Sequence, residues 1–412
     1  MQTHPIDSGL FLLTACLSCA AASADWPQWR GPTRDGASTE TGLLQQWPAA
    51  GPKLVWRATG LGAGFSTVSV SGSRLFSAGD MADASYVVAL NRADGKLLWK
   101  AKLGKTGGDP AGPRGTPTVE GEFVYELGQQ GDLVCVEVAR GGEVWRKNLK
   151  QGFKGECGGW LYSESVLVDG DRVICTPGGP QGTLLALNKK TGEVLWRCKE
   201  WTDNAEYSSP ILAIVEGVRQ YIQFTGQSVA GVAADTGKLL WRADRRGETA
   251  TVPTPIYFEH HVYVTSGYGV GCHLFNLTST AGRFAVEQVY ANNNMVNHHG
   301  GVILVGDYLY GFSDGRGWVC QDFKTGKIIW HNNGVGKGAH AYADGHLYLR
   351  SEGGKGTVAL VEATPAGYKE TGRFDQPERS NSQSWPHPVV AGGRLYLRDQ
   401  DLLLCYDVKA AR

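Results

Sequence analysis

The chain has 412 residues, of which 42% are hydrophobic, and it contains 57 glycines against 17 prolines. The 40 basic and 40 acidic residues leave a formal net charge of zero, which excludes the basic footprint of a nucleic-acid-binding protein. A chain of this size can bury a large core, and its many turn-forming glycines favour an all-β repeat protein over an α/β enzyme.

Residues 1–24 form a candidate signal peptide. An apolar run at 10–17 precedes Ala22-Ser23-Ala24, a small-residue pattern typical of cleavage after Ala24. A lipoprotein box ending at Cys16 is the less favoured alternative, because it leaves a shorter apolar run. We therefore expect a secreted or periplasmic protein that has no transmembrane span once the signal is removed.

Residues 25–52 form an extended segment without sustained periodicity, punctuated by proline and glycine. The segment opens with Trp26-Pro27-Gln28-Trp29-Arg30-Gly31-Pro32. We expect its tryptophans to pack on the outside of the domain.

Residues 53–410 repeat one short turn-then-strand motif. Its fullest copy is Asp235-Thr236-Gly237-Lys238-Leu239-Leu240-Trp241, in which glycine permits the turn and the apolar residues begin a strand. The motif returns at a period of about 40 to 50 residues, which is typical of a β-propeller blade. Two weak copies place Val286 and Thr371 in the tryptophan position, and these complete eight phases. The other six phases are marked by structural tryptophans: Trp56, Trp99, Trp145, Trp196, Trp241 and Trp330.

Each repeat divides into four strands, A to D from the channel outward. In the second blade we expect them at 116–119, 123–127, 133–138 and 144–146. The last repeat, 385–408, stops after strand C, whereas Leu54-Val55-Trp56-Arg57 is a D-type strand without a blade of its own. Pairing the two would cover exposed sheet edges. We predict an all-β, eight-bladed β-propeller of four-stranded antiparallel blades, closed by an N-terminal strand at 53–58 that completes blade 8.

Seven cysteines remain once the signal peptide is removed, and an odd number cannot pair completely. Cys135, Cys320 and Cys405 hold similar places in their repeats. A buried thiol acting as a small hydrophobe explains this placement better than a disulfide does.

The repeats resemble the tryptophan-docking repeats of the quinoprotein (pyrroloquinoline quinone, PQQ) dehydrogenase-like propellers. The opening segment at 26–32, together with Asn297-His298-His299-Gly300-Gly301 and Ser384-Trp385-Pro386-His387-Pro388, more narrowly resembles secreted bacterial PQQ-binding-like β-propeller repeat proteins. The resemblance covers nearly all of 25–410 and is specific for the fold. It does not by itself imply PQQ recognition, because the repeat tryptophan and glycine have structural roles.

The resemblance also implies what an enzyme of this kind would need. PQQ would lie between a tryptophan floor and a disulfide of two adjacent cysteines, with Ca²⁺ held by Glu and Asn and an Asp as base. This sequence has no Cys-Cys dipeptide and no haem-attachment Cys-x-x-Cys-His motif. Trp318 is a candidate floor, although a core aromatic is the favoured interpretation, and the asparagines at 292–294 have no nearby acid for a Ca²⁺ cage. We assign no catalytic and no metal-binding residue.

Aligned repeats place a polar set at the start of strand A, where the channel of a propeller opens. The candidate ligand-binding residues are Arg114, Glu156, Glu206, Tyr207, His298, His299, His340 and His387, with Phe65 and Thr251 in the two remaining blades. Their convergence would make either a polar ligand pocket or a water-filled channel of satisfied polar groups. Histidine charge would make ligand binding sensitive to pH between about 5 and 8. No local motif supports a metal site on these histidines.

These features predict a monomeric binding or scaffold propeller without catalytic activity. We expect it to hold an unknown small ligand or protein partner through its channel face and the rim loops at 104–115 and 374–384. One alternative is a PQQ-dependent dehydrogenase of alcohols or sugars, for which PQQ and Ca²⁺ would be the cofactors. The other is an outer-membrane assembly scaffold, because the barrel-assembly lipoproteins share the ring and hold other proteins with rim loops.

Overall fold

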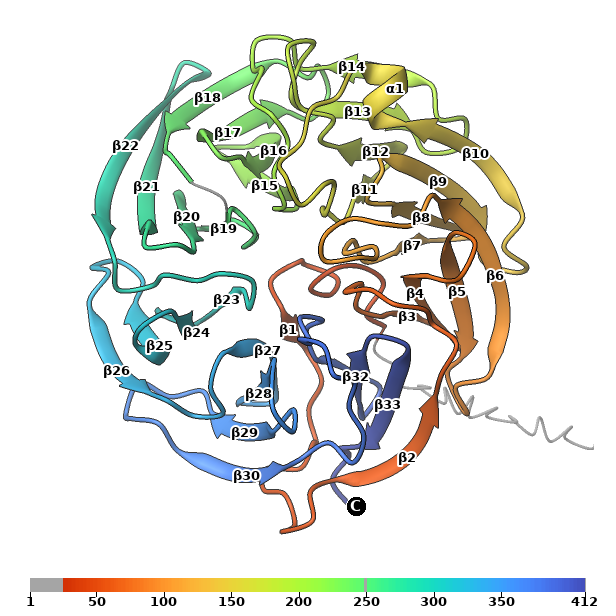
Figure 1. The fold of residues 1–412 in the computed structure, drawn as a ribbon. Coiled ribbons are helices and arrows are strands. Elements are labelled where there is room, and N and C mark those ends of the chain that lie inside the picture. Colours follow the sequence, from red (N-terminus) through yellow and green to blue (C-terminus); the bar gives the residue numbers. More distant parts are fainter. Residues whose placement is uncertain (1–24, 248–249, 412) are drawn as a thin grey trace, which may run out of the picture.

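A ring of eight antiparallel sheets surrounds a central channel in the computed structural model, which describes residues 25–247 and 250–411 (Figure 1). Within six of the blades the strands follow one another from the channel outward, whereas blades 7 and 8 each gain one strand from the N-terminal segment. The predicted eight-bladed, four-stranded propeller is therefore confirmed. The candidate signal peptide, residues 1–24, lies outside the described residues.

The first four blades contain four strands each. Their bounds are β3 (Ser69–Ser71), β4 (Arg74–Asp80), β5 (Ser85–Asn91) and β6 (Leu97–Gly104); β7 (Thr118–Glu120), β8 (Phe123–Leu127), β9 (Asp132–Glu137) and β10 (Glu143–Asn148); β11 (Leu167–Asp169), β12 (Arg172–Cys175), β13 (Leu185–Asn188) and β14 (Val194–Arg197); and β15 (Ile211–Val215), β16 (Val218–Phe224), β17 (Ser228–Ala233) and β18 (Leu239–Asp244).

The last four blades include both added N-terminal strands. Their bounds are β19 (Ile256–Phe258), β20 (His261–Ser266), β21 (Gly271–Thr280) and β22 (Arg283–Asn292); β23 (Val302–Val305), β24 (Tyr308–Ser313), β25 (Gly317–Asp322) and β26 (Ile328–Asn332); β1 (Ala37–Ser38), β27 (Gly338–Ala343), β28 (His346–Ser351), β29 (Val358–Glu362) and β30 (Glu370–Phe374); and β31 (Val389–Ala391), β32 (Arg394–Asp399), β33 (Leu402–Asp407) and β2 (Lys53–Ala58).

Helix is almost absent from the described part of the chain. The single helix there, α1 (Leu149–Phe153), follows β10 and is capped by the Asn148 side chain, which accepts a hydrogen bond from the Gln151 amide. No helix between residues 25 and 411, with 248 and 249 left aside, has the length and apolar character needed to cross a bilayer.

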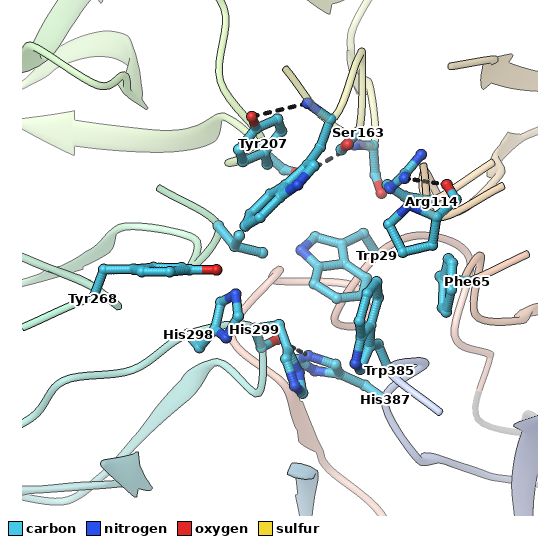
Figure 2. A pocket seen from close by; sticks show the side chains of 15 residues that line it. Trp29, Phe65, Arg114, Ser163, Tyr207, Tyr268, His298, His299, Trp385 and His387 are labelled. Carbon is cyan, nitrogen blue, oxygen red and sulfur yellow. Dashed lines mark hydrogen bonds between the residues drawn. The ribbon is translucent and has the colours of Figure 1, made fainter. Parts of the chain in front are cut away.

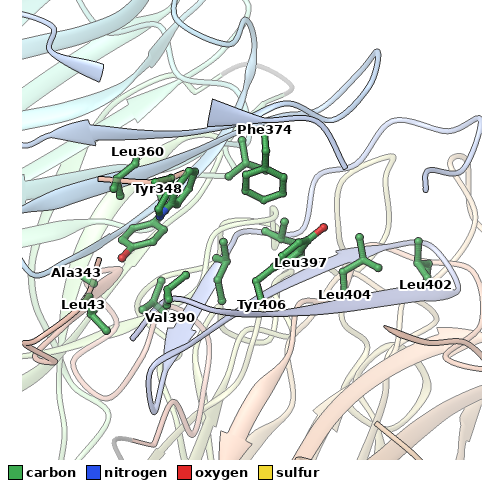
Figure 3. Packing of buried hydrophobic residues seen from close by; sticks show 14 residues of the cluster. Leu43, Ala343, Tyr348, Leu360, Phe374, Val390, Leu397, Leu402, Leu404 and Tyr406 are labelled. Atoms are coloured by element: carbon green, nitrogen blue, oxygen red, sulfur yellow. The ribbon is translucent and has the colours of Figure 1, made fainter. Parts of the chain in front are cut away.

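Blade 8 joins the two ends of the chain, as the sequence predicts. β2 pairs antiparallel with β33, from Lys53 opposite Asp407 to Ala58 opposite Leu403. Between blades 7 and 8 lies a buried apolar cluster that includes Tyr348, Phe374, Val390, Leu397, Leu404 and Tyr406 (Figure 3). The pairing covers edges that would otherwise be open, and the cluster seals the neighbouring inter-blade seam.

The repeat tryptophans link each blade to the next. The indole N–H of Trp56 donates to Arg92 O at 3.3 Å, and that of Trp145 donates to Lys189 O at 2.9 Å. Trp99, Trp196 and Trp330 each donate to a backbone carbonyl of the following blade in the same way. Trp241 differs, since its N–H donates to Gln220 Oε1 of its own blade at 2.5 Å.

The motif glycine is required by this docking. Gly95 has a φ of +72°, and a Cβ there would lie 2.8 Å from the ring of Trp56. Gly141, Gly192 and Gly237 meet the preceding tryptophan ring in the same way. The turn conformation and the close approach therefore both exclude a side chain at this position.

Two weak repeats have a different residue in the tryptophan position. Strand pairing puts Tyr290, not Val286, there, because the β21–β22 hairpin is long and its turn lies farther from the ring. The Tyr290 hydroxyl donates to Phe323 O of the next blade. In blade 7 the position belongs to Gly372, not Thr371, and the backbone and Cβ of Trp47 from the N-terminal segment pack against it.

The cysteines in similar repeat positions lie directly across from the tryptophans. Cys135 pairs with Trp145, Cys320 with Trp330, and Cys405 with Trp56. These three thiols are fully buried, and all seven cysteines among the described residues are free. They therefore act as small core residues.

Residues 25–38 run through the channel, so the expectation that the tryptophans of the segment pack outside was wrong for Trp26 and Trp29 (Figure 1). Trp47 does pack on the outermost strand of blade 7, β30, where its ring meets that of Phe374. Trp26 exchanges two backbone hydrogen bonds with Val70 in blade 1, and Val119 of blade 2 donates to Pro27 O. β1 then pairs parallel with β27, the innermost strand of blade 7. Without this segment the channel-facing edges of the inner strands would be unpaired, and the segment satisfies several of their backbone groups.

Two buried arginines anchor the segment. Arg30 donates to Val302 O at 2.6 Å and to Asp35 O at 2.7 Å, and Arg34 donates to Val166 O at 3.1 Å. Burial lowers the pKa of Arg30 to about 10 and that of Arg34 to about 9, so both remain charged at neutral pH. Their guanidinium groups connect blades 3 and 6 to the N-terminal segment in the channel.

Candidate functional site

A cavity of about 330 Å³ lies at one end of the channel, where the innermost strands begin (Figure 2). Its wall follows the eight-fold repeat. Counting six residues back from the last residue of each innermost strand gives Phe65, Arg114, Ser163, Ser209, Val252, His299, Lys337 and Trp385, and all of these except Lys337 line the cavity. One register position therefore supplies seven of the fifteen lining residues.

Aromatic rings make up much of the remaining surface. Phe65 and Trp385 stack with their centroids 4.2 Å apart, and Trp160 lies 5.0 Å from Tyr207. Tyr268, which is 61% exposed, points its hydroxyl into the cavity from the opposite side (Figure 2).

The N-terminal segment contributes Trp29 to the cavity. Its ring lies 4.5 Å from that of His387, and its indole N–H donates to Thr254 Oγ1 at 2.9 Å. The ring is therefore fixed between blades 5 and 8. Together with the other lining side chains it makes a concave, largely apolar site with a few polar groups, the usual form of a small-molecule pocket.

Arg114 is the cationic group of the lining. Its guanidinium donates to Pro110 O at 2.5 Å and to Gly112 O at 3.1 Å, which fixes it within its own loop. Burial lowers its pKa, and it forms no ion pair with any described residue. At neutral pH the wall therefore carries a positive charge that no carboxylate contacts directly, although Asp80 and Asp109 are near enough to stabilise it.

The histidines of the wall are held by specific partners. Lys337 Nζ lies 3.0 Å from His298 Nδ1, and because an ammonium can only donate, Nδ1 is the acceptor. His387 Nε2 donates to the carbonyl of His299 at 3.0 Å. His299 Nε2 lies 2.5 Å from Glu352 Oε2, which also accepts from the Trp385 indole.

These environments contradict the expected pH window for three histidines. Burial lowers the pKa of His298 to about 4 and that of His340 to about 3, and it holds the pKa of His387 well below its usual value. Nearby positive charge, including Lys337 for His298, acts in the same direction. All three are neutral between pH 5 and 8, so they cannot produce the expected pH sensitivity of binding there.

The structure gathers five of the eight predicted ligand-binding residues around the cavity: Arg114, Tyr207, His298, His299 and His387. Phe65 also lines it, and Val252 stands there beside Thr251. The other three predicted residues do not line it.

Three predicted residues lie outside the cavity wall because the aligned repeat position was wrong for their blades: His340, Glu156 and Glu206. His340 lies inside β27, buried against Trp318, because β27 already begins at Gly338, which pairs with Ser351 of β28. Glu156 belongs to the long connection before β11, whose wall residue is Ser163. Glu206 interacts with the Tyr207 side chain but does not line the cavity, and burial raises its pKa to about 7.

Sequence reasoning missed Trp29, Trp160 and Tyr268. Trp29 was placed outside the ring, whereas Trp160 and Tyr268 lie outside the regular strands and follow no repeat phase. The pair Gly159-Trp160 is a weak turn signal, and nothing in it indicates a cavity wall.

The residues present do not fit a PQQ and Ca²⁺ site. Among the described residues, no three His, Cys, Asp or Glu side chains come together to hold a metal ion, and no carboxylate lines the cavity. Ca²⁺ needs several convergent oxygen ligands. No disulfide of adjacent cysteines can form either, because the sequence has no such pair.

Comparison with known proteins places this ring in a defined group. The family profile described as outer membrane protein assembly factor BamB matches residues 40–125 and 83–332. The outer membrane protein assembly factor BamB of Kangiella koreensis is 26% identical over 232 residues, which cover 53% of this chain and 50% of that protein. The chain thus spans about half the length of this relative.

Solved structures share the fold. BamB from Moraxella catarrhalis has a TM-score of 0.55 at 17% identity, covering 81% of this chain and 94% of that one. The quinohemoprotein alcohol dehydrogenase from Comamonas testosteroni has a TM-score of 0.65 at 12% identity, covering 94% of this chain and 81% of that one. At such identities the likeness concerns the fold, which is common to an assembly factor and an oxidoreductase.

Proposed function

We propose that this chain, which belongs to the family described as outer membrane protein assembly factor BamB, is a non-catalytic periplasmic scaffold in outer-membrane protein assembly. The observation that carries the proposal is the family match, which extends over most of the ring. The absence of a fitting PQQ and Ca²⁺ site among the described residues favours the scaffold over the dehydrogenase alternative.

The face around the cavity is the surface that we propose for the partner protein. Pro110 and Arg114, from the rim loop at 104–115, stand in the cavity wall. The rim loop at 374–384 leads directly into Trp385, which lines the same cavity. Both long rim loops therefore border one face of the ring, and loops on a rigid scaffold are the usual carriers of binding.

These loops are held in place before any partner arrives. Arg379 Nε donates to Asp399 Oδ2 at 2.6 Å, and the amide of Ser380 donates to the same oxygen at 2.7 Å. In the other loop, the Gly107 amide donates to Asp80 Oδ2 at 2.9 Å. A preformed surface loses less conformational freedom on binding, which favours affinity.

Site-specific photo-crosslinking in the bacterium of origin tests this surface. A benzophenone amino acid at Tyr268, on the cavity face, should crosslink to one protein of the outer-membrane assembly machinery. The matched control is Val289, which is 47% exposed on β22 at the outside of the ring. Crosslinking from Val289 alone, or unchanged levels of outer-membrane β-barrel proteins after deletion of the gene, would contradict the proposal.

The dehydrogenase alternative has its own test. Protein incubated with PQQ and Ca²⁺ should not reduce an artificial dye in the presence of primary alcohols or sugars. Dye reduction that depends on added PQQ would overturn the non-catalytic assignment.

A further inference from the structure

The cavity offers hydrogen-bond donors and aromatic faces, but no carboxylate among its described lining residues. This chemistry is independent of the proposed partner protein, because it concerns the inside of the cavity and not the rim. It restricts the class of small molecule that the cavity can hold.

The polar groups left over inside the cavity mostly donate. Arg114 donates two of its N–H groups to carbonyls of its own loop, and its other N–H groups remain as donors for a ligand. Neutral His298 accepts through Nδ1, so its proton resides on Nε2, which is then a donor. The Tyr268 hydroxyl points into the cavity (Figure 2).

Two common ligand classes fit this chemistry poorly. Aromatic cages bind quaternary ammonium ions, but the positive charge of Arg114 would repel a cation. A sugar presents many hydroxyl donors, and its recognition needs acceptor groups, which the described lining side chains supply mainly as the hydroxyls of serine and tyrosine and not as carboxylates. An acceptor-rich anion with a flat apolar body matches both the donors and the rings.

We propose that the cavity binds a small planar aromatic carboxylate. Its ring system would lie among the indoles of Trp29, Trp160 and Trp385, where offset stacking and burial of apolar surface stabilise it. Its carboxylate would pair with the guanidinium of Arg114, which suits planar carboxylates geometrically. A cavity of about 330 Å³ is at the small end of ligand sites, which favours a molecule of one or two rings.

Isothermal titration calorimetry with three probes tests the proposal. 2-Naphthoate carries both the ring and the charge, 2-naphthalenemethanol carries the ring alone, and cyclohexanecarboxylate carries the charge alone. We expect saturable binding of 2-naphthoate and an affinity at least about tenfold lower for each of the other two, because each lacks one interaction.

Two variants assign the interactions to residues. Arg114→Gln should weaken 2-naphthoate binding about tenfold or more and leave 2-naphthalenemethanol unchanged, since only the charge is lost. Trp160→Ala should weaken both aromatic probes. Arg316→Gln is the control, because Arg316 does not line the cavity and donates to Asn293 O.

The outcomes separate clearly. Failure of 2-naphthoate to bind, equal binding of the neutral alcohol, or unchanged binding by Arg114→Gln would each overturn the proposal. Unfolding midpoints of the variants verify that they are folded. A negative result here leaves the proposed scaffold role untouched, because crosslinking of a protein to Tyr268 measures that role separately.

Discussion

Replacing Trp241 by alanine should be among the most damaging single changes to this ring. Its side chain is 4% exposed and packs in a cluster that includes Phe224, Phe275 and Leu277 at the seam between blades 4 and 5. Removing a buried aromatic ring of this kind costs about 3 to 5 kcal/mol of unfolding free energy.

The lost hydrogen bond adds to this cost. Gln220 is fully buried, and its Nε2 already has no partner, so the alanine variant would leave both amide atoms unsatisfied. Leaving such an acceptor unpaired costs about 1 to 3 kcal/mol. We therefore expect Trp241→Ala to lose about 4 to 8 kcal/mol in total. Trp241→Phe keeps most of the packing, so it should lose mainly the hydrogen-bond contribution of about 1 to 3 kcal/mol.

Equilibrium unfolding in guanidinium chloride, followed by circular dichroism, measures these losses. Trp160→Ala is the matched control, because Trp160 is only half-buried at the cavity and its backbone hydrogen bond to Tyr207 does not need the indole. The control should change stability by less than about 1 kcal/mol. A loss below about 1.5 kcal/mol for Trp241→Ala would refute the assignment of a docked ring.

Three further changes test other parts of the structure. Gly95→Ala should destabilise the ring more than Gly72→Ala in thermal unfolding, because both have positive φ but only at Gly95 would a Cβ meet a tryptophan ring. Burial raises the pKa of Glu164 to about 7, above its usual 4.5, so the folded state retains a proton that the unfolded chain releases. The free energy of unfolding should therefore fall as pH rises from 4.5 through 7. In Glu164→Gln, urea titrations at several pH values should show a smaller fall. The same pH dependence in both proteins would show that this carboxyl ionises normally. Arg30→Met should speed hydrogen exchange of the Tyr342 amide, which donates to Gly36 O of the N-terminal segment at 3.0 Å. Amides in β17 should keep their protection. Equal exchange of the Tyr342 amide in the variant and the original protein would mean that Arg30 does not anchor the segment.

The number of blades and the closure of the ring could be predicted because they are encoded in a repeated local motif. Turn glycine and docking tryptophan recur with the blade, and the missing last strand indicates where the first strand goes. The prediction failed where a repeat changes its length. The long β21–β22 hairpin puts Tyr290 where counting from the turn puts Val286.

The candidate site was only partly predictable, since it depends on where each strand begins relative to the channel. His340 was misplaced because β27 begins as early as Gly338 in its pairing with β28, so that the wall position of this blade falls on Lys337. Trp29 was misplaced because a Trp- and Arg-containing segment has the same composition whether it covers a surface or fills a channel. Such placements follow from tertiary packing, which no local pattern contains.

The joining of both chain ends in blade 8 also sets the order in which the molecule can assemble. β2 is synthesised early, but β33, its partner, is among the last strands to be made. Residues 25–38, which precede β2, occupy the channel, and threading them into a finished ring would be topologically costly. We therefore expect the blades to assemble around this segment, with the final strand locking it in place, and refolding to be slow because the last contact spans nearly the whole polypeptide.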